Sequence, residues 1–185
     1  GTTWNEQYSN SITTFSSVWF TDKNNGRAYG DGLYVTSNGG KTWNQKNTIG
    51  GIKAVDVNNS KLGFAVGGGG TIGKTEDGGE TWKTFPSNLY SWDEFRSIFF
   101  INENFGWIGG FYSFKTNDGG NTWKTMPAQS SFKIYFKDEN TGYSIRTSFV
   151  KTTDGGLTWI GLLPTVSLVY TSFSMIEDNL WVVQK

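Results

Sequence analysis

The stretch TEDGGETW, residues 75–82, combines two carboxylates with two threonines, two glycines and a tryptophan. Carboxylates on a glycine-rich turn could bind a hard cation, because such cations are held by several oxygen ligands. The stretch has three relatives in the chain, TSNGGKTW (36–43), TNDGGNTW (116–123) and TTDGGLTW (152–159). The only acidic or amide position that all four copies share is the third one, which holds a single Asp or Asn. One carboxylate in a turn is a poor cation cage, so we predict no metal site and no cofactor.

A motif that recurs at a fixed period belongs to the architecture before it belongs to a ligand. In T-x-D/N-G-G-x-T-W the Asp or Asn oxygen can accept backbone N–H groups of a turn, while the glycines take positive φ angles. The threonine can add a side-chain to backbone bond, and the tryptophan can pack between repeats. We assign this structural role to Asn38, Trp43, Asp77, Trp82, Asp118, Trp123, Asp154 and Trp159.

The repeats also predict the elements that carry these turns. Within residues 50–85, the segments IKAVDV, GFAVGG, TIGKTE and ETWKTF are short strands bounded by Gly, Asn or Asp, with no room for a helix. The same order recurs in the other repeats. Consecutive four-stranded antiparallel units of about 40 residues indicate an all-β β-propeller. An antiparallel sandwich is the alternative, but it predicts no fixed tryptophan period.

We expect one propeller domain over residues 1–185, in which two partial repeats flank four complete ones. The opening GTTW matches the end of the motif, and SFSMIEDNLWVVQK provides two strands of a further blade. One strand of that blade would be missing, which predicts a segment of a larger propeller, a short five-bladed ring, or a gap filled by a partner strand. The expected repeats are approximately 11–49, 50–88, 89–128 and 129–163, with a split blade of 1–10 and 164–185.

Composition excludes several functional classes. Sixteen basic and sixteen acidic residues give a net charge of zero, and no basic run predicts a nucleic-acid partner. No apolar run is long enough for membrane insertion. The chain contains neither Cys nor His, which excludes Ser-His-Asp and Cys-His nucleophiles and the usual zinc ligand sets. Carboxylate, Lys, Tyr, Ser and Thr chemistry stays open.

The motif resembles the S/T-x-D-x-G-x-T-W pattern of the Asp-box, or BNR, repeat family, from which residues 36–43 depart in carrying Asn38. The longer stretches FINENFGWIGGFYSFKTNDGGNTW (100–123) and FKDENTGYSIRTSFVKTTDGGLTW (136–159) resemble the branch related to the photosystem II stability and assembly factor. This resemblance implies a β-propeller in a secreted, periplasmic or cell-surface protein. The family includes hydrolases, sorting receptors and assembly factors, so the motif implies no single function.

The resemblance further implies that the motif turns share one face and that ligand sites lie on the opposite one. The link FPSNLYSWDEF (85–95) is outside the repeat pattern, and an exposed Tyr and Trp beside acids suit sugar stacking or a protein hot spot. A packed or merely solvated loop is the alternative. The candidate binding residues are Tyr90, Trp92, Asp93, Glu94, Tyr112 and Arg146.

We therefore expect a non-catalytic binding or scaffold module with a protein or glycan partner. One alternative is a sialidase-like glycoside hydrolase, which FRSI at 95–98 faintly resembles and which needs three convergent arginines. Its two carboxylates would flank one bond about 5–9.5 Å apart, whereas Asp93 and Glu94 are adjacent in sequence. The other alternative is a structural repeat that self-associates or accepts a partner strand at its open blade.

Overall fold

The computed structural model describes residues 6, 14–46, 51–57, 61–85, 94–127, 130–145, 148–162, 170–176 and 179–184. The strands of the first two sheets are β1 (Phe15–Phe20), β2 (Gly26–Gly30), β3 (Leu33–Thr36), β4 (Asn44–Lys46), β5 (Ile52–Val57), β6 (Gly63–Gly67), β7 (Ile72–Thr75) and β8 (Lys83–Phe85). Those of the third and fourth sheets are β9 (Ser97–Phe100), β10 (Gly106–Gly109), β11 (Phe114–Thr116), β12 (Lys124–Thr125), β13 (Lys133–Phe136), β14 (Gly142–Ile145), β15 (Phe149–Thr152) and β16 (Ile160–Gly161). The last sheet contains β17 (Tyr170–Ile176) and β18 (Asn179–Gln184).

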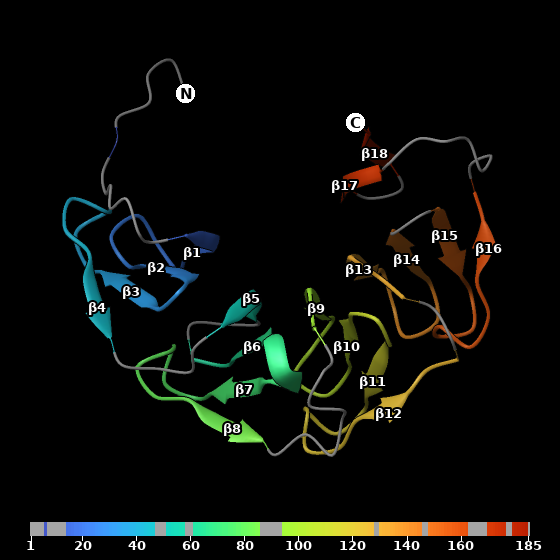
Figure 1. The fold of residues 1–185 in the computed structure, drawn as a ribbon, viewed down its shortest axis with the longest axis horizontal. Coiled ribbons are helices and arrows are strands. Elements are labelled where there is room, and N and C mark those ends of the chain that lie inside the picture. The colour runs from blue at the N-terminus through green and yellow to red at the C-terminus, as the bar shows by residue number, and fades with distance from the viewer. Residues whose placement is uncertain are drawn as a thin grey trace.

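Each of the first four sheets is antiparallel, with its strands in chain order. The sheets follow one another around an open arc, with the first strand of each sheet toward the centre and the fourth at the rim (Figure 1). Neighbouring sheets touch through their inner strands, as β5 does with β9 and β9 with β13. This is the arrangement of β-propeller blades, so the predicted fold class is confirmed.

Two details differ from the sequence prediction. The loop after β6 contains one short 3-10 turn, η1 (Gly68–Gly70), although no helix was expected. Each fourth strand also begins one residue after the motif tryptophan, because that residue still belongs to the turn, where the indole N–H of Trp82 donates to the Gly79 carbonyl at 3.2 Å. The opening segment, which matches the end of the motif and was expected to add a strand near residues 2–7, lies outside the described residues except for Glu6, which is exposed and not in a strand.

The glycine that opens each second strand makes room for the end of the first strand. Phe100 is paired directly with Gly106, and Phe136 with Gly142. A Cβ at either glycine would lie 2.5 Å from the ring of the paired phenylalanine. The phenylalanine ring therefore lies over the glycine, which explains why these two residues keep a fixed spacing in the repeat.

The core lies between the sheets. Successive residues of one strand point to opposite faces of a sheet, and directly paired residues of neighbouring strands point to the same face. Accordingly Phe100 of β9 stacks on Phe64 of the second sheet, with ring centroids 3.8 Å apart. Trp107 of the neighbouring β10 faces the other way and stacks on Phe136 of the fourth sheet at 3.7 Å. A blade alone would leave both faces in water, so the array stabilises itself through such junctions.

The four motifs form one recurring turn. In the second copy Asp77 Oδ1 accepts hydrogen bonds from the Thr75 hydroxyl at 2.8 Å and from the Thr81 N–H at 2.9 Å. The Thr75 hydroxyl oxygen also accepts from the Gly79 N–H at 2.7 Å, and Gly79 has a φ of 92°. Asp118 and Asp154 repeat the carboxylate contacts. The carboxylate oxygens are thus used within the turn.

Three of the four motif tryptophans lie at the junctions between sheets, whereas Trp43 meets Phe20 of its own sheet edge to face. Trp82 meets Tyr29 of the preceding sheet edge to face, with ring centroids 6.1 Å apart. Trp123 packs against the cluster that contains Phe64 and Phe100, and Trp159 against the cluster that contains Trp107 and Phe136. Each of these three junction tryptophans is half-buried and fills the rim side of a junction.

Candidate functional site

The loops opposite the motif turns contain two of the six candidate binding residues within the described part of the chain. Glu94 precedes β9, and Tyr112 lies between β10 and β11. Tyr90, Trp92, Asp93 and Arg146 lie outside the described residues. The site is therefore built from Glu94, Tyr112 and their neighbours.

Backbone hydrogen bonds hold three loops of this end together. The Arg96 N–H donates to the Gly109 carbonyl at 2.8 Å, and the Ser131 N–H donates to the Gly110 carbonyl at 2.8 Å. Both glycines permit this close approach. A Cβ at Gly110 would lie 2.6 Å from the Glu94 carbonyl oxygen, and one at Gly109 would lie 3.0 Å from the Ser131 side chain. The loops 94–96, 110–113 and 130–132 thus form one continuous surface.

Buried residues fix this surface from below. Phe95 is fully buried and meets Phe114 edge to face, which anchors the segment that carries Glu94 and Arg96. Ser131 is also buried, and its hydroxyl accepts a hydrogen bond from the Ser144 hydroxyl at 2.7 Å. Because Phe95 and Ser131 are packed in this way, the neighbouring side chains of Glu94, Arg96 and Phe132 are held at defined positions.

Aromatic rings and one ion pair make up the exposed part of the surface. Arg96 donates to Glu94 Oε2 at 2.9 Å, and its guanidinium lies over the Phe132 ring, 4.9 Å from the centroid. Phe111, Tyr112 and Phe132 are 48%, 37% and 40% exposed. We call Glu94, Arg96, Phe111, Tyr112 and Phe132 the loop surface. It combines apolar rings with hydrogen-bonding groups, which is the chemistry of a recognition surface.

Sequence reasoning did not select Arg96 and Phe132 as binding residues. Both stand directly before the first strand of a repeat, where the loop of one blade meets the loop of the next. The signal available in the sequence was an aromatic or basic residue just outside the strand pattern at that junction. Their cation–π contact depends on the distance between two loops, which a single sequence does not reveal.

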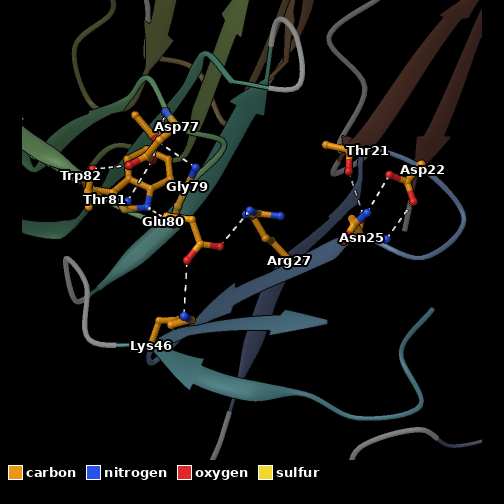
Figure 2. A network of polar contacts seen from close by, with 11 residues as sticks. Thr21, Asp22, Asn25, Arg27, Lys46, Asp77, Gly79, Glu80, Thr81 and Trp82 are labelled. Atoms are coloured by element: carbon orange, nitrogen blue, oxygen red, sulfur yellow. Dashed lines mark hydrogen bonds and ion pairs between the residues drawn. The ribbon is translucent and has the colours of Figure 1, made fainter. Parts of the chain in front are cut away.

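Arg27 lies at the opposite end of the sheets, where it joins the first sheet to the second (Figure 2). Arg27 directly follows Gly26, the glycine that opens β2. In the second and third sheets the residue after the corresponding glycine is Phe64 and Trp107, respectively. The Arg27 guanidinium pairs with Glu80 at 3.3 Å, and Lys46 approaches the other carboxylate oxygen of Glu80 at 3.3 Å. Arg27 and Arg96 therefore do not converge on one ligand. The Arg27 Nε is buried with no hydrogen-bond partner.

Two further findings concern only the described residues. Among them, no three His, Cys, Asp or Glu side chains are grouped closely enough to hold a metal ion. No helix in the described part of the chain has the length and apolarity to cross a membrane.

No family model matches the chain, and no curated protein sequence matches it significantly. Solved structures do. YCF48 bound to D1 peptide is 27% identical over 69% of this chain and 44% of that chain, with a TM-score of 0.62. The GH74 enzyme of Niastella koreensis is 17% identical over 87% and 32%, with a TM-score of 0.66. PorZ, a surface component of the type IX secretion system of Porphyromonas gingivalis, is 12% identical over 94% and 26%, with a TM-score of 0.67.

These similarities agree with the sheet arrangement, and together they show a β-propeller. The chain spans less than half of each of the three structures. The same fold carries both a peptide-bound protein and an enzyme, so the function of this chain has to be argued from its own surface.

Proposed function

We propose that the chain is a non-catalytic binding module that recognises a protein segment through the loop surface. The observation that carries this proposal is the exposure of Phe111, Tyr112 and Phe132 around the Arg96–Glu94 pair. Aromatic and arginine side chains dominate the energetics of protein recognition, because aromatic rings bury much area at a low cost in rotamer entropy and arginine adds directional hydrogen bonds. Those of the loop surface stand on packed loops, so binding would require little further ordering.

The ion pair suggests how such a surface discriminates between partners. Arg96 is held in place by the Phe132 ring and by Glu94. A partner carboxylate could replace Glu94 on the guanidinium, while apolar side chains of the partner cover Phe111 and Tyr112. The off-pattern residues Tyr90, Trp92 and Asp93 directly precede Glu94 in the chain and belong to the same proposed site.

The similarity to YCF48 supports a protein partner over a glycan, because that structure contains a bound peptide. The recurring turn supports membership of the Asp-box repeat family, whose motif three of the four copies match. PorZ, a surface component, supports an extracellular, periplasmic or cell-surface location. We propose all three on these grounds.

We also propose that the chain does not hydrolyse glycosides. Glu94 is paired with Arg96, and Arg27 lies at the other end of the sheets, so the described residues offer no cluster of three arginines for a sialic-acid carboxylate. Fluorogenic sialoside and β-glucoside substrates test this point. Turnover that is abolished by Asp93→Asn would contradict it.

Self-association is a second candidate function, supported by both ends of the arc. Trp181 and Val183 of β18 are 53% and 56% exposed, and Val18 of β1 is 62% exposed. Trp181 is paired with Ser174 of β17, so its side chain lies on the opposite face of the sheet from Phe173, which packs on the fourth sheet. A second copy or a partner strand could cover these faces, which predicts concentration-dependent assembly that is lost on removal of residues 1–7.

The binding proposal is tested by selecting phage-displayed random peptides on the purified protein. The affinity of each selected peptide is then measured for the unchanged protein and for the triple variant Arg96→Ala, Phe111→Ser, Phe132→Ser. We expect their affinity to fall by at least about tenfold, as for removal of a hot spot. Ile160→Ser, a change at an apolar residue 68% exposed on the rim, is the matched control and should leave affinity unchanged. Equal binding to the triple variant would refute the proposal.

A further inference from the structure

Two sheets carry a pair of lysines in the same place. Lys74 and Lys83 are directly opposite each other on β7 and β8, and Lys115 and Lys124 are directly opposite on β11 and β12. Like charges at directly opposed positions of neighbouring strands destabilise a sheet. A nearby negative charge would therefore stabilise such a pair.

The second sheet provides that charge itself. One Glu76 carboxylate oxygen lies 3.2 Å from Lys74 Nζ, and the other lies 3.9 Å from Lys83 Nζ. In the third sheet the residue at the position of Glu76 is Asn117. Among the described residues, neither Lys115 nor Lys124 forms a salt bridge. The third sheet thus has the lysine pair of the second without its acid.

The hydrogen-bond and ring partners of Lys115 are both neutral. Its Nζ donates to the Glu139 carbonyl at 3.3 Å and lies 5.2 Å from the centroid of the Trp107 ring. Burial lowers the pKa of Lys115, and the charge of Glu139 opposes this shift without entering salt-bridge distance. A partly desolvated ammonium gains more from an added carboxylate than a solvated one does.

The lysine pair opens into a groove of about 330 Å³ between the third and fourth sheets. Phe105, Met126 and Leu157 provide its apolar lining, and Leu157 is 64% exposed. Asp154 lies on the opposite wall, where both of its carboxylate oxygens already accept hydrogen bonds from Thr152 and Thr158. The groove therefore contains two lysine cations and one carboxylate that is already hydrogen-bonded. Its net charge is positive, and it lies beside an apolar surface.

The groove also borders an unpaired sheet edge. β12 is the rim strand of its sheet, and the Met126 N–H points inward to the Ser113 carbonyl at 2.8 Å. Successive residues of a strand direct their backbone groups to opposite sides, so the N–H and C=O of Thr125 point outward. Thr125 is itself part of the groove lining. An extended segment can pair with such an edge and place alternate side chains in the groove.

We propose that this groove binds an extended acidic peptide segment, whose carboxylate bridges Lys115 and Lys124 and whose apolar side chain two residues away packs on Met126 and Leu157. The carboxylate takes the place that Glu76 has in the second sheet. The groove lies beside the motif turn 154–157, at the opposite end of the sheets from the loop surface. It is a separate site, and it stands or falls independently of the proposed function.

The test uses a fluorescent heptapeptide, blocked at both ends, with a glutamate and a leucine two residues apart in a threonine background. Its affinity for the full chain is measured by anisotropy at low salt. A peptide with glutamine in place of the glutamate should bind at least about fivefold more weakly, because a lysine–carboxylate bond with a partly buried lysine is lost. Lys124→Met should weaken the glutamate peptide by about three- to fivefold.

The decisive variant is Asn117→Glu, which gives the third sheet the acid of the second. It should weaken the glutamate peptide by at least about tenfold, since the new carboxylate occupies both lysines and repels the ligand. Lys83→Met in the second sheet is the matched control and should leave the affinity unchanged. A thermal melt of each variant checks that it is folded.

Four results with the peptides would overturn the proposal. These are absence of glutamate-peptide binding at millimolar concentration, equal binding of the glutamine peptide, undiminished binding to Asn117→Glu, and unchanged binding when alternate peptide amides are N-methylated. Unchanged binding of the N-methylated peptide would show that the peptide does not pair with the backbone of Thr125. Heptanoate, a carboxylate with an apolar tail but no peptide group, should bind far more weakly than the peptide, and equal affinity would assign the groove to small carboxylic acids instead.

Discussion

The Trp107 indole lies parallel to the Phe136 ring, 3.7 Å between centroids and 6° between planes, and joins the third sheet to the fourth. Phe64 and Phe100 make the same contact one junction earlier, at 3.8 Å and 9°. At the first junction the equivalent position is occupied by Arg27, which pairs with Glu80. Stacked aromatics thus join the second sheet to the third and the third to the fourth, whereas a buried cation paired with an acid occupies the same position at the first junction.

Removing the stacked indole should therefore destabilise the whole array. Trp107 is fully buried, and Trp107→Ala is expected to cost about 3–5 kcal/mol of the free energy of unfolding, as for other large core truncations. Trp181→Ala is the matched control, because Trp181 is 53% exposed on β18 of the last sheet, and it should cost less than about 1 kcal/mol. Urea denaturation compares the two. Similar losses would mean that the junctions are not the main source of stability.

The first junction should respond to charge. Glu80→Ala leaves the Arg27 guanidinium buried without its acid and is expected to destabilise by about 1–3 kcal/mol. Lys46, which is largely exposed, contacts the same carboxylate, so Lys46→Met should cost less than about 0.5 kcal/mol. Chemical denaturation in urea at low and high salt measures both. If Lys46→Met proved the more damaging change, Arg27 would not depend on Glu80.

The motif aspartates should matter as hydrogen-bond acceptors more than as charges. Asn38 already shows this, since its Oδ1 accepts from the Thr42 N–H at 3.0 Å and its Nδ2 donates to the Thr42 hydroxyl at 2.9 Å. Asp77→Asn should therefore be tolerated, whereas Asp77→Ala should destabilise by about 1 kcal/mol. Thermal melts of both variants decide. Equal losses would contradict the acceptor role.

The pH dependence of the same turn has a definite sign. Hydrogen bonds from Thr81 lower the pKa of Asp77 to about 2, below its ordinary value of 3.8. A depressed pKa means that the ionised form is favoured in the folded state, so the stabilisation is present above about pH 4 and is lost as pH falls toward 2. Because Asp77 is solvent-exposed, the effect should be small. Acid titration of Asp77→Asn should show a shallower loss of stability than wild type.

Asp56 should behave in the opposite way. Burial raises its pKa to about 6, although it accepts hydrogen bonds from the Phe100 and Val57 N–H groups. Its protonated form is favoured in the folded state, so its contribution is greatest below about pH 4 and is lost as pH rises to 6. Asp56→Asn should stabilise the protein at pH 7, by on the order of 1–3 kcal/mol, and leave it unchanged at pH 4. Destabilisation at pH 7 would show that the charge is required.

The fold could be predicted from the sequence because its rules are local and repeated. The spacing of Phe100 and Gly106 reports a direct cross-strand pair in which the ring covers the glycine. The motif predicts its own turn, because acid, threonine and glycines all lie within eight residues. Four copies of these signals sufficed for the strand order.

The candidate site could be predicted only in part, because it depends on contacts between loops. Glu94 was found as a residue of the link outside the repeat pattern and Tyr112 as a residue of the expected loop face, but the partner of Glu94 is Arg96, and Arg96 is held by Phe132 from the next sheet. The lysine groove was not predicted at all. Lys115 and Lys124 look like ordinary strand lysines until the register shows them opposite each other beside Asn117.

The measurement that tests recognition by the loop surface most directly is amide hydrogen exchange of the protein with and without a selected peptide. We predict that protection appears in residues 94–96, 110–113 and 130–132, and that it disappears in the triple variant Arg96→Ala, Phe111→Ser, Phe132→Ser. Protection confined to other parts of the chain, such as β12 and the turn 154–157, would contradict the assignment of this surface as the binding site.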